Sequence, residues 1–225
     1  MFADIASVFQ VVRSKWIMHW LAVLAVSLLA LLAAADSHGD DSNPVVLIVG
    51  DSISAGLGVP VDKQWPLILE QKLQVEFPQL TVAVAAISGD TTSSGRGRLP
   101  SLLTAHAPTV TILALGGNDA LRGTPLPLVK NNLIAMIDAA KNNNSAVALA
   151  GMQIPPNYGP TYTEGFRQMY IDLAEEYDLG LIPFLLEGVA TVDGMMQSDG
   201  IHPTTDAQPV LADNVAPVIT SLLQE

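Results

Sequence analysis

The sequence predicts an α/β protein whose parallel sheet is covered by helices on both faces. Apolar runs alternate five times with segments of helical periodicity, which is typical of parallel strands joined by right-handed crossovers. The first run, Val45 to Val49, is uniformly apolar and stops at Gly50, as expected for a strand buried on both faces. The chain has 225 residues, enough for one sizeable core, and it contains no internal repeat or second domain boundary.

The other elements follow from local patterns of the same kind. Trp65-Pro66 favours a helix start, because the missing N–H of a proline has no partner in a first turn anyway. Pro108 ends a second helix and precedes a third strand. Further strands are expected at 80–87, 109–115, 145–152 and 179–183, and helices at 65–77, 94–106, 126–142, 163–177 and 205–223.

Composition and charge exclude several classes of protein. Hydrophobic residues make up 49% of the chain and charged residues 14%, which indicates a globular protein rather than a disordered one. The net charge is -12 and no Lys/Arg cluster is present, which argues against nucleic-acid binding because phosphates need basic partners. Cysteine is absent, so disulfides, thiolate nucleophiles, Cys-based metal sites and Cys-linked lipids are excluded.

The first 35 residues have the pattern of a secretory signal peptide. Arg13 and Lys15 precede an apolar run of 15 residues from Leu21 to Ala35, which ends in an A-x-A site. This run is shorter than the roughly 20 residues that span a bilayer. We therefore predict cleavage after Ala35, a linker over 36–44, one folded domain over 45–225, and a periplasmic or secreted protein. The alternative is an uncleaved anchor to the inner membrane over 17–35.

Polar signatures follow three of the predicted strands and precede the last helix. They contain Ser52, Gly89, Asn118 and the pair Asp199 and His202. Ligand sites of parallel sheets lie at the carboxyl ends of the strands, so these side chains are expected to meet at one edge.

Together these residues supply what acyl transfer requires. A serine becomes a nucleophile when a base removes its proton, and His202 is the candidate base for Ser52. Asp199 lies three residues earlier and is placed to orient the imidazole of His202. The Ser52 N–H, the Gly89 N–H and the Asn118 side-chain amide are candidate donors to the oxyanion, with Gly89 expected where no Cβ fits.

Each candidate also has a purely structural interpretation. Ser52 and Ser54 could cap a helix, Gly89 could serve only a turn, and Asn118 could cap the following helix through an Asx turn. Asp119 and Arg122 are expected to form a local ion pair or to hold the loop, rather than to take part in catalysis.

Other catalytic patterns are missing from the sequence. The G-x-S-x-G nucleophile elbow does not occur, which argues against an α/β-hydrolase. Neither do H-E-x-x-H, a P-loop or G-x-G-x-x-G. Asp199 and His202 lack a third and fourth ligand nearby, so we predict no metal and no cofactor.

The four polar blocks in this order resemble the SGNH (GDSL-type) hydrolase family over roughly 45–223. Ser52, Gly89, Asn118 and His202 match its four signature positions, with Ile53 where the family's name has Leu. The segments G-D-S-I-S-A-G, L-G-G-N-D-A-L-R-G and S-D-G-I-H-P are most similar to the bacterial thioesterase I / protease I / lysophospholipase L1 subgroup.

The resemblance implies a three-layer α/β/α sandwich of flavodoxin-like type with a five-stranded sheet. It also implies a periplasmic serine esterase that acts on acyl thioesters, lysophospholipids and simple esters, with no obligatory protein partner and at most transient membrane contact. It places the loop Thr124 to Pro127 beside the acyl groove, so we hypothesise that Pro125 and Pro127 affect acyl-chain preference. The alternatives are a carbohydrate O-acetylesterase of the same family and a non-catalytic binding module on the same fold.

Overall fold

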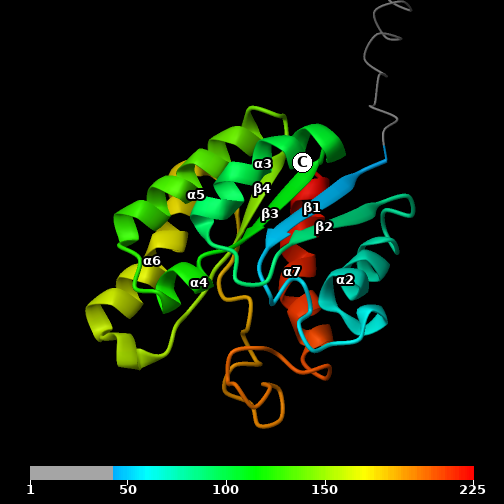
Figure 1. Cartoon of the computed structure of the whole chain (residues 1–225). Coiled ribbons are helices and arrows are strands. Elements are labelled where there is room, and N and C mark those ends of the chain that lie inside the picture. Colours follow the sequence, from blue (N-terminus) through cyan, green and yellow to red (C-terminus); the bar gives the residue numbers. More distant parts are fainter. Residues whose placement is uncertain (1–42) are drawn as a thin grey trace, which may run out of the picture. The chain divides into compact units, whose positions relative to one another are not determined.

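A single parallel sheet organises the part of the chain that the computed structural model describes, residues 43–225 (Figure 1). Its strand order is β2-β1-β3-β4-β5. The strands are β1 (Val45–Gly50), β2 (Thr81–Ala86), β3 (Val110–Ala114), β4 (Ala146–Ala150) and β5 (Gly180–Ile182). All four neighbouring pairs run parallel. The predicted five-stranded parallel sheet is therefore confirmed.

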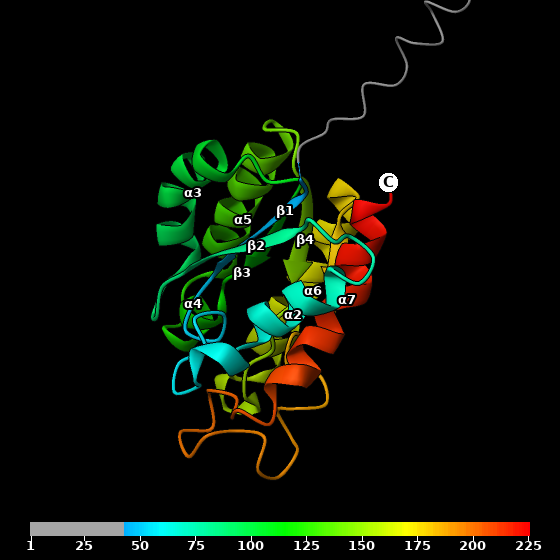
Figure 2. The same cartoon turned by 90° about the vertical axis from the view of Figure 1, so that its right-hand side faces the viewer.

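Helices cover the sheet in two layers. The helices are α2 (Trp65–Leu73), α3 (Thr92–His106), α4 (Gly117–Leu121), α5 (Leu126–Lys141), α6 (Pro160–Tyr177) and α7 (Gln208–Leu223), with 3-10 turns η1 (Val61–Lys63) and η2 (Pro156–Tyr158). On one side α3 packs against α5, and α6 lies beside α5; on the other, α2 packs against α7. Figure 2 shows α3 and α5 separated from α2 and α7 by the sheet. The arrangement is the predicted α/β/α sandwich.

Burial explains the uniformly apolar strands. Every residue of β3 is buried, and β1 is buried from Val46 onward. Both strands lie inside the sheet, so each of their faces packs against a helical layer. The edge strand β2 is only partly buried, which fits its composition of small residues and valines.

The predicted helices differ most from the structure at two places, and the bounds of the other helices agree to within about three residues. The helix α2 ends at Leu73, before the predicted Phe77, because the chain continues as turns toward Pro78, which disfavours helical backbone at the residue before it. The helix α4 was not predicted: its five residues were interpreted as a polar turn, which is too short to show periodicity. Gly116, at φ 120°, starts it, so Asn118 lies within the helix and does not cap one.

The predicted signal peptide or anchor and most of the predicted linker lie outside the described residues. Within residues 43–225, no helix combines the length and the apolar character needed to cross a membrane.

Candidate active site

Ser52 lies directly after β1, at the carboxyl edge of the sheet. The chain turns tightly there, because the Ala55 N–H donates to the Asp51 carbonyl at 2.9 Å and the Leu57 N–H donates to the Ser52 carbonyl at 3.1 Å. This turn is not the start of any helix, so Ser52 is not a helix cap. Ser52 is 8% exposed and borders a surface pocket.

His202 and Asp199 reach Ser52 from a loop far along the chain. The Nε2 atom of His202 is 2.9 Å from Ser52 Oγ, and its Nδ1 atom is 2.7 Å from Asp199 Oδ2. The other carboxylate oxygen of Asp199 accepts the backbone N–H groups of Ile201 and His202, at 2.9 and 3.0 Å. The hydrogen bonds from His202, with those two N–H groups, hold the pKa of Asp199 well below its usual range, so it stays ionised.

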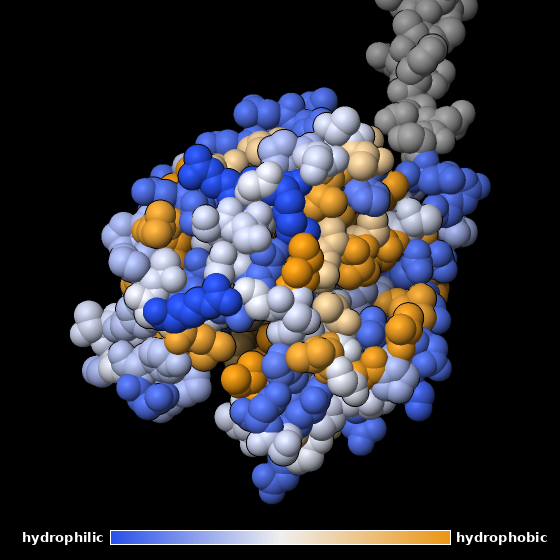
Figure 3. All heavy atoms as spheres, in the orientation of Figure 1, coloured by the Kyte–Doolittle hydropathy of each residue, from blue (hydrophilic) through white to orange (hydrophobic). Residues whose placement is uncertain are grey.

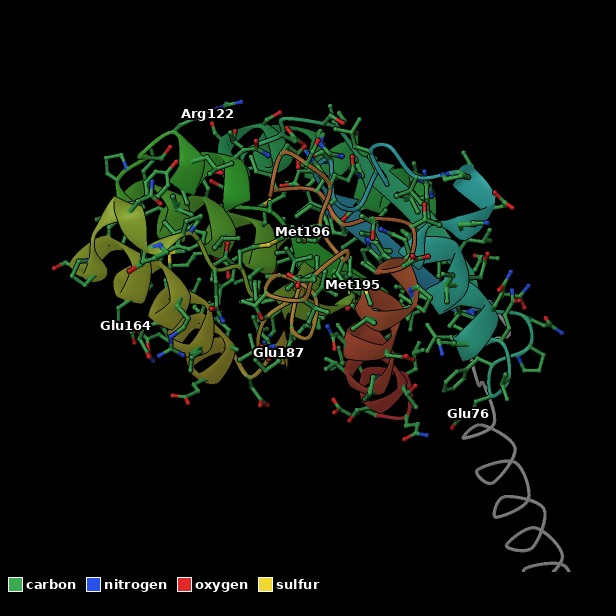
Figure 4. The ribbon with its side chains drawn as sticks, turned by 90° about the horizontal axis from the view of Figure 1, so that it is seen from below. Glu76, Arg122, Glu164, Glu187, Met195 and Met196 are labelled. Atoms are coloured by element: carbon green, nitrogen blue, oxygen red, sulfur yellow. The ribbon has the colours of Figure 1, made fainter. Side chains whose placement is uncertain are left out.

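Gln197 attaches the loop that carries His202 to the turn that carries Ser52. Its side-chain amide donates to the carbonyls of Leu57 and Pro203, at 2.8 and 2.9 Å. Its backbone N–H donates to the His202 carbonyl at 2.7 Å. Figure 4 shows Met195 and Met196, just before Gln197, on the loop that crosses below the sheet. No motif marks Gln197, so sequence reasoning missed it.

Three candidate hydrogen-bond donors belong to residues at the same pocket as Ser52 Oγ. Among the described residues, the backbone N–H groups of Ser52 and Gly89 have no hydrogen-bond acceptor. Asn118 uses one amide hydrogen on Asp51, which leaves its second one available. All three residues line the pocket. The expected reason for Gly89 is wrong: a Cβ there would meet nothing closer than 3.8 Å, and it is the φ of +80° that favours glycine.

Asp51 holds Asn118 in place, a contact that the sequence did not reveal. Its Oδ2 atom accepts from Asn118 Nδ2 at 3.1 Å, and its Oδ1 atom accepts the Ile53 N–H at 3.0 Å. Asp51 is 3% exposed, and this burial raises its pKa from 3.8 to about 6. A buried carboxylate beside Ser52 thus orients the Asn118 amide while carrying a desolvation cost.

The desolvation cost of the Asp51 carboxylate predicts how the stability of an Asp51→Asn variant depends on pH. The folded-state pKa of about 6 lies above the unfolded value of 3.8, so ionisation of Asp51 destabilises the folded state progressively as pH rises from 4 to above 6. The shift corresponds to up to about 3 kcal/mol at pH 7. The stability of Asp51→Asn relative to the native chain should therefore improve by that amount between pH 4 and 7, measured by urea unfolding. A difference that does not change with pH would contradict this.

Apolar side chains surround the polar centre of the pocket. The pocket has a volume of about 280 Å³. Leu57, Leu121 and Ile201 line it and stay 47%, 36% and 42% exposed. Figure 3 shows a hollow between the surface around α4 and the loop below the sheet, with hydrophobic side chains on the edge of the hollow. The pocket thus offers an apolar wall beside Ser52.

The structure decides between the two expected roles of Asp119 and Arg122, because these side chains form no ion pair with each other. Asp119 is buried and accepts the N–H and the hydroxyl of Thr92. Arg122 donates to the Gly89 carbonyl at 3.0 Å, and Figure 4 shows it at the outer rim of the molecule. The two side chains hold the loop, as the other half of the expectation stated. Within residues 43–225, no three His, Asp or Glu side chains are grouped so that they could hold a metal ion.

Comparison with known proteins places this geometry in a family. The model of the GDSL-like Lipase/Acylhydrolase family matches residues 48–208. The chain belongs to this family. The GDSL resemblance of the sequence is therefore confirmed, and the chain is a hydrolase.

Relatives and solved structures agree with the GDSL assignment. The chain is 44% identical to Esterase TesA of Pseudomonas aeruginosa, over 89% of this chain and 96% of the relative. It is 38% identical to Thioesterase 1/protease 1/lysophospholipase L1 of Escherichia coli K12, over 93% and 94%. The crystal structure of TesA superposes with a TM-score of 0.76 at 45% identity, and covers 79% of this chain and 99% of its own. The crystal structure of the psychrotrophic esterase EstA from Pseudoalteromonas sp. also superposes with a TM-score of 0.76. Its sequence is 33% identical, and the match covers 82% of this chain and 100% of EstA.

Proposed function

We propose that this GDSL hydrolase cleaves carboxylic esters and acyl thioesters, including lysophospholipid-type substrates, through an acyl-enzyme on Ser52. The chain is a serine hydrolase, and its relatives are named as an esterase, an arylesterase and a thioesterase/lysophospholipase. The observation that carries the residue assignment is the hydrogen-bonded series Ser52, His202 and Asp199 beside three available donors in one pocket.

In the first half of the reaction, Ser52 Oγ attacks the acyl carbonyl carbon and His202 Nε2 takes the hydroxyl proton. Asp199 accepts the Nδ1 hydrogen of His202 and stabilises the imidazolium that forms. The carbonyl oxygen becomes an oxyanion and accepts hydrogen bonds from the Ser52 N–H, the Gly89 N–H and Asn118 Nδ2. The intermediate collapses, the bond to the leaving oxygen or sulfur breaks, and His202 returns the proton to the leaving group.

In the second half, water replaces the alcohol or thiol. His202 removes a proton from the water, the hydroxide oxygen attacks the acyl carbon, and the same three donors stabilise the second oxyanion. Collapse releases the carboxylic acid and returns the proton to Ser52 Oγ, which completes hydrolysis.

Asn118→Ala tests the oxyanion assignment. The substitution removes a donor while leaving Ser52 and His202 in contact, so kcat should fall about 10²–10³-fold with little change in KM. The measurement is steady-state kinetics on p-nitrophenyl esters, with circular dichroism as the check on folding. A folded variant with native kcat would show that Asn118 is not an oxyanion donor.

A substrate series separates the proposed function from its alternative. Rates are measured on straight-chain esters from C2 to C16, on the matching acyl-CoA thioesters, and on acetylated sugars. The apolar side chains Leu57, Leu121 and Ile201 at the pocket favour acyl chains over sugars. Preference for acetylated sugars would instead identify a carbohydrate O-acetylesterase, and no turnover of any of these substrates would contradict the proposed function.

The loop that precedes α5 offers a test of acyl-chain preference. Pro125 is the N-cap residue of α5 and Pro127 lies in the first turn of that helix, so both restrict the backbone there, and the Tyr162 hydroxyl donates to the Thr124 carbonyl at 2.7 Å. Replacing both prolines with alanine should loosen the loop next to Leu121 in the pocket and shift the preferred chain length across the C2 to C16 series. An unchanged profile in a folded variant would exclude this role.

The protein is proposed to act in the periplasm or outside the cell. The support is the basic start, the apolar run from Leu21 to Ala35 and the A-x-A site. N-terminal sequencing of the mature protein should begin at Asp36, whereas an intact N-terminus in the membrane fraction would indicate the anchor.

A further inference from the structure

The two oxyanion donors Gly89 and Asn118 belong to different segments of the chain. Gly89 lies in the loop between β2 and α3, whereas Asn118 lies in α4 after β3. A productive oxyanion hole needs both donors within hydrogen-bond distance of the same oxygen. Some contact between the segments must therefore set the distance between these donors.

Asp119, the neighbour of Asn118, makes this contact. Its Oδ2 atom accepts the Thr92 N–H at 2.8 Å, and its Oδ1 atom accepts the Thr92 hydroxyl at 2.7 Å. Thr92 is the first residue of α3 and ends the loop that contains Gly89. Both side chains are buried, at 2% and 0% exposure, so neither bond competes with water.

The hydrogen bonds around Thr92 and Asp119 extend to a residue of α5. A further hydrogen bond joins the end of α4 to the Gly89 loop. The Asn132 amide donates to the Thr92 hydroxyl at 3.2 Å, which holds that hydroxyl toward Asp119. Arg122, at the end of α4, donates to the Gly89 carbonyl at 3.0 Å. The segment from Gly89 to Thr92 is thus attached to α4 at both of its ends.

Charge neutralisation does not explain why a buried carboxylate stands at position 119. Within residues 43–225, no Lys, Arg or His forms an ion pair with it. A buried carboxylate is costly unless its hydrogen bonds are well formed, and a neutral side chain would suffice if only packing were needed. The two hydrogen bonds to Thr92 are therefore what a carboxylate contributes at position 119.

We propose that Asp119 is a positioning residue that fixes the spacing of the oxyanion donors Gly89 and Asn118 through its paired hydrogen bonds to Thr92. The inference rests on the oxyanion role of Asn118 in the proposed function. Asp119 does not touch the substrate; it acts by keeping α4 and the Gly89 loop in register.

The test is a mutant cycle between positions 118 and 119. Asp119→Ala, which removes both bonds, should lower kcat on p-nitrophenyl esters about 10- to 100-fold and leave KM within about 2-fold. In the Asn118→Ala background the donor pair is already broken, so Asp119→Ala should lower kcat by less than about 3-fold more. If the two substitutions acted independently, their fold-losses in kcat would multiply. That result is expected if Asp119 has a purely structural role.

Thr92→Val and Thr111→Val provide a matched pair of milder variants. Both threonines are buried, and each hydroxyl bonds another side chain: Thr92 to Asp119 at 2.7 Å, and Thr111 to Ser145 at 2.8 Å, inside the sheet. Thr92→Val should lower kcat with KM unchanged, whereas Thr111→Val should lower only the unfolding temperature. If Asp119→Ala does not fold, Thr92→Val in the native and Asn118→Ala backgrounds completes the same cycle.

The outcomes distinguish this inference from the proposed function. If Ser52→Ala retains activity, or Asn118→Ala retains native kcat, the proposed function fails and the role of Asp119 fails with it. If both of those variants are impaired but the effects at 118 and 119 multiply, or Thr92→Val behaves as Thr111→Val does, only the role of Asp119 is overturned.

Discussion

Replacing Ser52 with alanine is expected to lower the rate of ester hydrolysis by about 10⁴-fold or more. Without Oγ there is no nucleophile for His202 to activate, although the pocket and the oxyanion donors stay in place. Because the substitution removes only the hydrogen bond between Ser52 Oγ and His202 Nε2, the free energy of unfolding should change little. Hydrolysis of the C2 to C16 esters and labelling by a phosphonate ester probe provide the measurements.

Ser54 supplies the matched control for this experiment. It lies two residues further along the same turn, it is fully buried, and its hydroxyl has no hydrogen-bond partner among the described residues. Ser54→Ala should therefore keep native kinetics and take up the phosphonate label. If Ser52→Ala still hydrolyses esters, or if the label is found elsewhere, Ser52 is not the nucleophile.

Replacing Asp199 with asparagine is expected to lower kcat by about 10²–10⁴-fold. The Oδ1 atom of an asparagine can still accept the N–H groups of Ile201 and His202, so the loop should keep its shape. Its NH₂ group then faces His202 Nδ1 and favours the tautomer with the proton on Nε2, which cannot accept the Ser52 proton. The measurement is kcat and KM on a p-nitrophenyl ester.

Asp206→Asn is the control, because Asp206 is an exposed carboxylate on the same loop. That variant should retain native kinetics while the net charge changes by the same amount. Native kcat in Asp199→Asn would mean that His202 does not need Asp199 to select its tautomer. Equal losses in both variants would instead indicate an effect of overall charge.

The clearest patterns in the sequence were those of the strands. They also located most of the polar residues that the structure brings together, because these residues follow the strands directly. Uniform apolar runs predicted buried parallel strands, and the residues after those runs had to gather at one edge. This reasoning selected Ser52, Gly89 and Asn118, which the structure places around one pocket. His202, from the block that precedes the last helix, was predicted to be the base, and its Nε2 atom is 2.9 Å from Ser52 Oγ.

The supporting contacts were not predictable in the same way. Asp51 follows a strand as Ser52 does, but nothing in the sequence states that it accepts a hydrogen bond from Asn118. Gln197 and Thr92 belong to no motif, and their bonds to Leu57 and Asp119 join segments that are distant in the chain. Such pairs depend on side-chain direction and on the angle between elements, neither of which has a periodic signature.

By itself the sequence determined the parallel α/β fold, its family and the set of reactive residue types, because periodicity, motif order and composition are properties of the chain alone. Only the tertiary structure decided how those residues act on one another. It raised the pKa of Asp51 through burial, left the N–H groups of Ser52 and Gly89 without acceptors among the described residues, and gave Asp119 its partner in Thr92. Burial and hydrogen-bond pairing arise only when distant segments pack together, so they are absent from any local pattern.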